Sequence, residues 1–526
     1  MKQQQRLNTA LCTIFLTVAT VSSNMLGQNS RPEAETQPNV VFFLVDDMGW
    51  QDTSVPFHTE TTDFNKRYRT PNMERLAEQG TLYTNAYASC PVCTPTRVSI
   101  MTGQHPARLG ITNWTLHAHR DSSAGHDRLR SPAWNTQGLQ PDALTLAELL
   151  QANGYCTIHA GKAHWGALDT PGADPLNHGF DINIAGHAAG APGSYYGTDN
   201  FSDEVRRGKP QGNSPWPVPG LDAYHGQEVY LTEVLTKESI KAIDDAIAVN
   251  KPFFLHLGHY AVHTPIMADP SFIDHYPELS KREAAYASMV EGVDQSLGQL
   301  MDALDERGIL DNTIIIFTSD NGGLSGRAGA SENHNAPLRH GKGFAYEGGV
   351  RIPQIISVPG SQSSRTDRVT VSQDLFPTIL QMTNTEIPIE AANQMDGHSI
   401  VDSLDGKNPD AYRVVGWHYP HQWTQPGPGL QAFTSIRAGN EKLIYFYGDE
   451  QFELYDLEDD ISEKNNLASA QPHRVEELSQ LMRHWMRQTG AKTPINKETN
   501  QPLSLPSLHA WSSQQSNSDP MLIEDE

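Results

Sequence analysis

Long runs of apolar residues alternate with amphipathic stretches over the first four hundred residues of the chain. The clearest apolar runs cover residues 40–45, 253–257 and 313–317, and a further strand is predicted over 155–160. Each run has the length of a strand and is apolar enough to be buried on both faces of a sheet. From 286 to 304, apolar residues recur every three or four positions, which predicts a helix that ends near Gly308. The alternation predicts one doubly wound α/β domain over residues 36–405.

The pattern changes after residue 405, where shorter stretches with turn residues between them replace the long runs. These stretches are 433–437, 443–447 and 452–457. An apolar stripe over 475–486 predicts one helix beside them. Residues 406–494 are therefore predicted to form a C-terminal α+β subdomain, a small antiparallel sheet covered by a helix. Residues 495–526 are polar and are predicted to be a disordered tail.

The first 30 residues are typical of a secretory signal peptide. Lys2 and Arg6 precede an apolar run, 11–21, that is short for a membrane span, and small residues at 21–23 offer a cleavage site. We therefore expect an exported protein, periplasmic or secreted, with no stable membrane insertion.

Charge and cysteine content narrow the class of protein. The chain has 62 acidic and 38 basic residues and a formal net charge of -24. Such a charge argues against nucleic acid or anionic lipid as a partner, and any site for an anion must be built from local cations. After the signal peptide only Cys90, Cys93 and Cys156 remain. This odd, small number does not indicate a disulfide framework and leaves at least one cysteine for another task.

Two pairs of polar residues follow predicted strands directly. Asp46 and Asp47 come after the run 40–45, and Asp320 and Asn321 come shortly after 313–317. Open α/β sheets place their sites at the carboxyl ends of their strands. Oxygen ligands of this kind favour Ca²⁺ or Mg²⁺ over zinc. A single Asp-Asp pair would more often be a solvated turn. The two pairs therefore indicate a metal site only when they are taken together.

The stretch 93–97 reads Cys-Thr-Pro-Thr-Arg and follows a strand predicted over 82–87. Thr94 can cap a helix that begins at the proline, whose fixed φ suits that position. Gly103 fits the left-handed position that ends such a helix. Cys93 would then lie beside a helix N-terminus, which favours an anion, with Arg97 one turn further on. By itself the stretch is also compatible with a buried cysteine before a proline turn.

The same stretch, continued by Met-Thr-Gly-Gln at 101–104, closely resembles the activation site of the type I sulfatases, which most often have serine at the position of Thr96. The segment 161–166, Gly-Lys-Ala-His-Trp-Gly, is similar to the family's Gly-Lys-Trp-His-Leu-Gly, and Leu-Tyr-Asp-Leu at 454–457 looks like its C-terminal segment. The chain thus resembles formylglycine-dependent, arylsulfatase-like enzymes, among them exported bacterial carbohydrate sulfatases. The resemblance implies an alkaline-phosphatase-like fold with a large mixed sheet flanked by helices.

The resemblance also implies the cofactors and the site. Cys93 would be converted to 3-oxoalanine (formylglycine) by a formylglycine-generating enzyme or a radical maturase, and its hydrate would be the nucleophile. One Ca²⁺, with Mg²⁺ as the less expected ion, would be held by Asp46, Asp47, Asp320, Asn321 and the modified side chain of Cys93. Arg97 would stabilise the hydrate and His164 would assist its deprotonation. Sulfate oxygens would be bound by Lys162, His263 and Lys342. His263 and Lys342 are alternatives for the acid that protonates the leaving group.

The implied function is a sulfuric ester hydrolase that removes sulfate from a sulfated oligo- or polysaccharide, at a chain end, in polysaccharide degradation. Residues expected to rim the site and contact sugar are Trp114, His117, Tyr195, Tyr196 and His340. One alternative is a phosphatase or phosphonate monoester hydrolase on the same fold, although the additional His and Asp ligands of two-metal members are not found. The other is a non-catalytic glycan-binding relative, which would normally have lost the nucleophile or a ligand.

Overall fold

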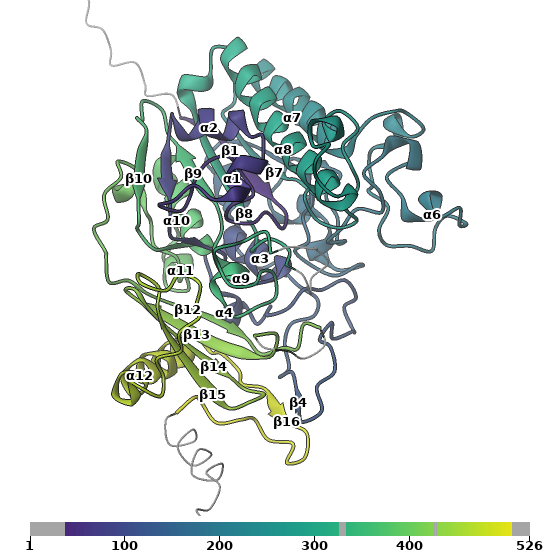
Figure 1. The fold of residues 1–526 in the computed structure, drawn as a ribbon. Coiled ribbons are helices and arrows are strands. Elements are labelled where there is room, and N and C mark those ends of the chain that lie inside the picture. The colour runs from purple at the N-terminus through teal and green to yellow at the C-terminus, as the bar shows by residue number, and fades with distance from the viewer. Residues whose placement is uncertain (1–36, 326–332, 425–426, 428, 508–526) are drawn as a thin grey trace, which may run out of the picture. The chain divides into compact units, whose positions relative to one another are not determined.

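A large mixed sheet forms the centre of the α/β part of the molecule (Figure 1). The computed structural model describes residues 37–325, 333–424, 427 and 429–507. The predicted signal peptide lies outside these residues. In spatial order the eight strands of the sheet are β10 (Ser364–Thr366), β2 (Thr81–Tyr83), β9 (Gln354–Ser357), β8 (Thr313–Ser319), β1 (Asn39–Val45), β7 (Phe253–Gly258), β5 (Cys156–Gly161) and β6 (Ile182–Ile184).

The central strands of this sheet are parallel. β1 pairs in parallel with β7 and β8, and β5 pairs in parallel with β7, whereas β9 is antiparallel to both of its neighbours. The register places Val45 opposite Ser319 and Gly161 opposite Gly258. The carboxyl ends of β1, β5, β7 and β8 therefore meet at one edge of the sheet, where an α/β fold gathers its functional residues.

Successive residues of β1 point into two separate cores, because side chains alternate across a strand. The odd-numbered residues pack against α2 (Pro71–Ala77), α7 (Leu231–Ala248) and α8 (Lys281–Glu306). The even-numbered residues pack against α3 (Cys93–Thr102), α5 (Leu146–Ala152) and α10 (Leu375–Met382). Helices therefore cover both faces of the sheet, which is why its strands are continuous apolar runs.

The C-terminal part forms a second, antiparallel sheet. Its strands in order are β12 (Val414–Tyr419), β13 (Phe433–Ala438), β14 (Glu441–Phe446) and β15 (Gln451–Asp456). One face packs on α12 (Pro472–Thr489) and the other on residues around Tyr87 and Val92 of the α/β part. The indole of Trp417 also donates a hydrogen bond to the carbonyl oxygen of Ala88, at 2.8 Å. The predicted combination of a large mixed sheet with a small antiparallel sheet and a helix is confirmed.

The remaining helices and strands are short. They are β3 (Ala86–Tyr87), β4 (Leu129–Arg130), β11 (Thr370–Val371), β16 (Ile495–Asn496), α1 (Asp63–Arg67), α4 (Pro106–Leu109), α6 (Asp203–Arg206), α9 (Glu347–Val350) and α11 (Ile389–Ala392). Within the described part of the chain, no helix has the length and apolar character required to cross a bilayer.

Two predicted boundaries are wrong, and one strand was missed. The strand predicted over 82–87 is split into β2 and β3, which pair in different sheets. β12 was not predicted at all. The tail predicted to be disordered from residue 495 begins as ordered chain, because β16 pairs with β4 and Leu503 packs in the core beneath α12. Pairing with a partner more than three hundred residues away leaves no local pattern in the sequence. Residues 508–526 lie outside the described chain.

A buried ion cluster joins the C-terminal sheet to the α/β part. The ammonium of Lys442, on β14, lies 3.0 Å from Glu347 and 3.0 Å from Glu463, and all three side chains are fully buried. Burial alone would raise the pKa of Glu347, but Lys442 and two nearby arginines lower it to about 2. Lys442 therefore holds together two carboxylates that would otherwise repel each other.

We expect Lys442→Met to lower the free energy of unfolding by about 3–5 kcal/mol, because it removes the cation that Glu347 and Glu463 share and leaves the buried Glu463 carboxylate without a cation. Urea titration followed by circular dichroism measures the change. Lys464→Met, which removes an exposed lysine beside Glu463, is the matched control and should change stability by less than about 0.5 kcal/mol. Equal stability of the two variants would show that the cluster does not stabilise the fold.

Candidate functional site

The site lies at the carboxyl ends of the parallel strands. Asp46 and Asp47 directly follow β1, Asp320 and Asn321 follow β8, and Lys162 follows β5. All five side chains are at most 1% exposed. The structure thus brings together residues that are up to 275 positions apart, because the parallel register aligns the strand ends.

Hydrogen bonds fix the positions of the acidic residues. The side-chain amide of Asn321 donates to Asp47 Oδ1 at 2.8 Å, and the backbone N–H of Asp47 donates to Asp320 Oδ1 at 3.2 Å. Asp47 has a φ of 60°, a left-handed conformation that is uncommon outside glycine. Such conformations persist where the surroundings impose them, often at functional sites.

Each buried carboxylate is paired with its own cation. The pairs are Lys162 with Asp46 (Nζ–Oδ2 2.7 Å), Arg97 with Asp320 (Nε–Oδ2 2.8 Å) and Lys342 with Asp47 (Nζ–Oδ1 2.5 Å). Arg97 also donates to the carbonyl oxygen of Lys162 at 2.7 Å. Three negative and three positive charges therefore balance, so any bound divalent cation would make the site net positive and suited to an anion.

Burial and neighbouring charges shift the pKa values of these carboxyl groups in different directions. Burial raises the pKa of Asp46 well above its usual range, and Lys162 offsets only part of the effect. For Asp47 and Asp320, burial also acts upward, but the nearby cations lower the pKa below the usual range. Asp46 is thus the carboxylate that gains most from an additional cation.

The residues fit a hard divalent metal ion. Asp46 Oδ1, Asp47 Oδ2 and Asn321 Oδ1 are buried and have no hydrogen-bond partner among the described residues. Ligand atoms of Asp46, Asp47, Cys93 and His263 all lie within 4.8 Å of one another. Unpartnered buried oxygens of this kind are the ligands that Ca²⁺ and Mg²⁺ prefer. The cluster differs from the predicted ligand set by including His263 and by leaving out Asp320, whose two oxygens accept from Arg97 and from the backbone of Asp47.

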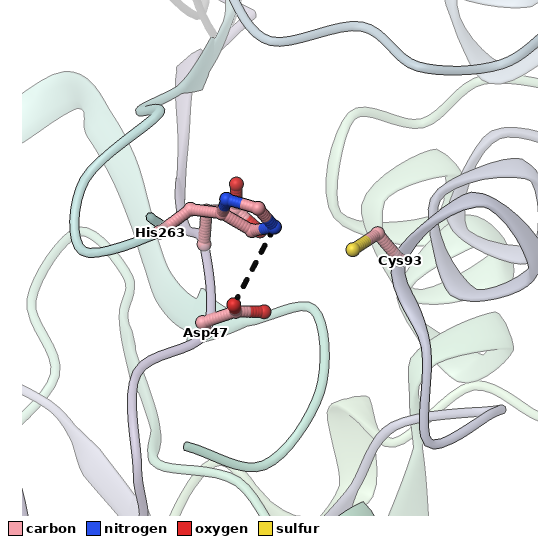
Figure 2. Close-up of side chains that lie close together, drawn as sticks. Asp47, Cys93 and His263 are labelled. Atoms are coloured by element: carbon pink, nitrogen blue, oxygen red, sulfur yellow. Dashed lines mark ion pairs between the residues drawn. The ribbon is translucent and has the colours of Figure 1, made fainter. Parts of the chain in front are cut away.

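His263 supports a cation at the same place. Its Nδ1 donates to the carbonyl oxygen of Thr264 at 2.8 Å, and burial lowers its pKa to about 3, so the neutral ring presents an unprotonated Nε2. Nε2 lies 3.6 Å from Asp47 Oδ2 (Figure 2). Two acceptors that face each other are stabilised by a proton donor or a positive charge between them. Tyr195 holds this segment, because its hydroxyl lies 2.8 Å from the carbonyl oxygen of His263.

Cys93 is the first residue of α3, and its sulfur points toward Asp47 and His263 (Figure 2). The predicted helix cap is wrong: Val92 is the N-cap residue, and the helix starts before Thr94. The C-terminal end is as predicted, with Gly103 at φ 68°. Cys93 is 4% exposed, and burial raises the pKa of its thiol to about 11 despite the nearby lysines. The unmodified thiol is therefore protonated and is a weak nucleophile.

His164 is held as a neutral base. Its Nε2 lies 3.0 Å from the carbonyl oxygen of Thr115 and 3.1 Å from the hydroxyl of Thr94. Because a carbonyl only accepts, Nε2 carries the proton and Nδ1 is left with a lone pair, buried and without a partner among the described residues. Gly190 permits this placement, since a Cβ there would lie 2.4 Å from the imidazole. Thr94 therefore orients a histidine instead of capping a helix.

A cavity of about 240 Å³ leads to these residues. It is lined by Val92, Cys93, Trp114, Leu116, His164, Gly190, Ala191, Trp216, His263, Lys342 and Trp423. We call it the catalytic pocket. Lys342 Nζ lies 3.1 Å from Cys93 Sγ within it. Burial alone would lower the pKa of Lys342, but Asp47 and its neighbours raise it above the usual range, so the ammonium stays charged.

Two tryptophans of the pocket were missed in the sequence. Trp216 lies in a loop of the α/β part, and Trp423 lies in the segment after β12. A Cβ at Gly343 would lie 1.9 Å from the ring of Trp423, so only glycine lets this ring pack beside Lys342. A large aromatic residue within a Pro-, Gly- and Ser-rich loop is buried only when another segment covers it. This was the signal in the sequence that could have identified the two tryptophans.

The predicted rim is largely wrong. Trp114 lines the catalytic pocket, whereas the other four predicted residues do not. Tyr195 is fully buried, and Tyr196 donates from its hydroxyl to the carbonyl oxygen of Ala268 at 2.8 Å. His340 stacks on a phenylalanine ring, and His117 lines a neighbouring cavity. Aromatic residues in these loops pack among themselves because burial removes their large apolar area from water.

Comparison with known proteins agrees with this architecture. The family model described as Sulfatase matches residues 38–385, and the model N-sulphoglucosamine sulphohydrolase, C-terminal, matches residues 339–492. A sulfatase of Formosa agariphila is 29% identical, covering 90% of this chain and 93% of the relative. An N-acetylgalactosamine-6-O-sulfatase of Bacteroides thetaiotaomicron is 28% identical, covering 87% and 93%.

Among solved structures, Ps i-CgsB in complex with k-i-k-neocarrahexaose is similar, with a TM-score of 0.70 and 26% identity, covering 92% of this chain and 98% of the other. The predicted resemblance and the fold that it implied are confirmed. Because the family model covers residues 38–385, more than half of the chain, the match is not limited to the motifs around Cys93. The protein belongs to the sulfatase family and is a sulfuric ester hydrolase.

Proposed function

We propose that the protein removes sulfate from a sulfated carbohydrate, at a chain end, with Cys93 converted to formylglycine and one Ca²⁺ bound. The observation that carries the proposal is the floor of the catalytic pocket, where buried Cys93 meets the charged ammonium of Lys342 at 3.1 Å. A protonated thiol is a poor nucleophile there, whereas the hydrate of an aldehyde would supply an oxygen nucleophile.

Asp46, Asp47 and Asn321 would hold the metal through their unpartnered oxygens, with Asp320 and the modified Cys93 as further ligands. When bound, the ion would supply positive charge that stabilises the developing negative charge on the sulfate group. The residues of the chain then have separate tasks. His164 offers its free Nδ1 as a proton acceptor.

Lys342 is the cation placed to bind and orient the ester. Lys342 faces the catalytic pocket as a protonated donor, and Lys162 and Arg97 lie behind the carboxylates. His263 reaches the same pocket with an unprotonated Nε2 that is able to take a proton. Lys342 already carries a proton and is a candidate for protonating the leaving alcohol. His263 also lines the pocket next to Cys93 and becomes the alternative candidate once its Nε2 has taken up a proton.

A carbohydrate substrate is supported by the pocket walls and by the relatives. Trp114, Trp216 and Trp423 offer aromatic faces, on which sugar rings stack. The Bacteroides relative is named for N-acetylgalactosamine 6-O-sulfate chemistry, and the similar solved structure contains a neocarrahexaose. A pocket of about 240 Å³ with walls from separate segments suits a terminal sugar better than the middle of a polymer. Export through the N-terminal signal would bring the enzyme to such glycans in the periplasm or outside the cell.

Sulfate release tests this proposal. We expect hydrolysis of sulfated oligosaccharides, little hydrolysis of a chromogenic aryl sulfate, and none of a matched chromogenic phosphate or phosphonate ester. Binding energy from the sugar positions the sulfur, so small aryl esters lose rate. A sulfated polysaccharide should release sulfate faster after it has been cut to oligosaccharides. Equal rates on the intact polymer would contradict the chain-end claim. Hydrolysis of the aryl sulfate at a higher rate than every sulfated glycan would contradict the carbohydrate claim.

A further inference from the structure

A second cavity of about 350 Å³ lies beside the catalytic pocket. Its lining residues are Trp114, Leu116, His117, Arg120, Asp121, Ser122, Ser123, Pro215 and Trp216. Trp114, Leu116 and Trp216 also line the catalytic pocket, so the two cavities share one wall that contains two tryptophans. We call this second cavity the adjacent cavity. The two cavities are therefore neighbours in the structure.

The loop that forms the adjacent cavity is held in place by its own hydrogen bonds. Asp121 Oδ1 accepts from the backbone and hydroxyl of Ser123, at 2.9 and 2.7 Å, and from the indole of Trp134 at 3.1 Å. The backbone N–H of Arg120 donates to the carbonyl oxygen of His117 at 3.0 Å, which closes a turn. The Asp121 carboxylate is thus engaged within the loop, and Arg120 and His117 are presented to solvent.

Arg120 supplies the cationic side chain in the lining of the adjacent cavity. Within the described part of the chain it forms no ion pair with a carboxylate, although the protein as a whole carries a formal charge of -24. A third cavity, of about 200 Å³, shares Asp121 and Ser123 with the adjacent cavity and is lined by Arg130 and Lys497.

Arg130 and Lys497 form hydrogen bonds to neutral oxygen atoms and not to carboxylates. Arg130 donates to Asn500 Oδ1 at 2.7 Å, and Lys497 donates to the carbonyl oxygen of His126 at 2.6 Å. These cations give the two cavities local positive charge beside the Asp121 carboxylate, which is engaged within its own loop, in a protein whose overall charge is negative. The charge on Arg120 is therefore available to a ligand.

We propose that the adjacent cavity binds the sugar next to the one whose sulfate is removed, and that Arg120 recognises an anionic substituent on that sugar. The substituent is a second sulfate ester or a uronate carboxylate, both of which match a guanidinium. The inference rests on the proposed function, since it assumes that a glycan occupies the catalytic pocket. It narrows the substrate to a glycan with anionic groups on consecutive sugars.

The test compares two matched disaccharides that carry the same scissile sulfate. One has a second sulfate on the neighbouring sugar and the other has a hydroxyl there. A third, matched disaccharide has a uronate as its neighbouring sugar. We expect the wild-type kcat/KM to be about fivefold higher for the doubly anionic substrate, the effect of an exposed ion pair of about 1 kcal/mol. In Arg120→Gln this preference should vanish, while kcat/KM for the singly sulfated disaccharide stays unchanged. The preferred wild-type substrate distinguishes sulfate from uronate.

Arg282→Gln is the matched control, because Arg282 is an exposed arginine at the start of α8, outside the three cavities. It makes the same change in net charge and should keep the wild-type preference. An unchanged preference in Arg120→Gln, or an equal loss on both disaccharides, would overturn the inference. A wild-type enzyme without any preference between the disaccharides would also overturn the inference, but it would leave the proposed function intact. Wild-type enzyme that releases no sulfate from any glycan would overturn both.

Discussion

Cys93→Ala is expected to lower sulfate release by at least about 10³-fold while the protein remains folded. The thiol is buried at the floor of the catalytic pocket, 3.1 Å from the ammonium of Lys342. No other described residue places a group suited to becoming the nucleophile at this point, because the neighbouring carboxylates are paired with cations. Removal of the side chain leaves the substrate cations in place, so substrate binding should weaken much less than turnover.

Peptide mass analysis of active wild-type enzyme should find the sulfur lost from Cys93 and retained on Cys90. Cys90 is also buried, but its backbone, and not its thiol, bonds to Thr96, so Cys90→Ala is the matched control and should keep most of the activity. Circular dichroism checks the fold of both variants. An unmodified Cys93 thiol in fully active enzyme would rule out the proposed nucleophile.

Asp320→Asn is expected to reduce turnover by about 10²–10³-fold. The carboxylate accepts from Arg97 at 2.8 Å and from the backbone N–H of Asp47 at 3.2 Å. The amide has nearly the same shape but no charge, so Arg97 loses its counter-charge and the proposed metal loses an anionic ligand. The fully buried position prevents solvent from compensating. Metal content, measured on the purified variant, should fall together with activity.

Asp311→Asn is the matched control, because Asp311 precedes the same strand at its opposite, exposed end. It should retain wild-type activity and metal. Chelation of the wild-type enzyme should inhibit it, and added Ca²⁺ should restore activity better than Mg²⁺. If exhaustive removal of divalent ions left the rate unchanged, the assignment of Asp46, Asp47, Asp320 and Asn321 as metal ligands would be wrong.

The sequence alone determined where the chemistry would be found. The run 40–45 is apolar throughout and ends in Asp46 and Asp47, and 313–317 ends shortly before Asp320. Burial of a strand on both faces leaves a continuous apolar run, and the residues after it must lie at the edge of the sheet. These facts are local, so they were visible without the fold. The match of 93–97 to a known motif added the family.

Only the tertiary structure decided which groups pair and what surrounds the ester. Thr94, read locally as a helix cap, instead bonds to His164, seventy positions away. Tyr195, predicted to contact sugar, is buried beneath His263. Trp216 and Trp423 form pocket walls although neither has a local pattern to mark it. Contacts between distant segments depend on which surfaces the strand order brings together, and a linear pattern records only how polar each residue is, not what it faces.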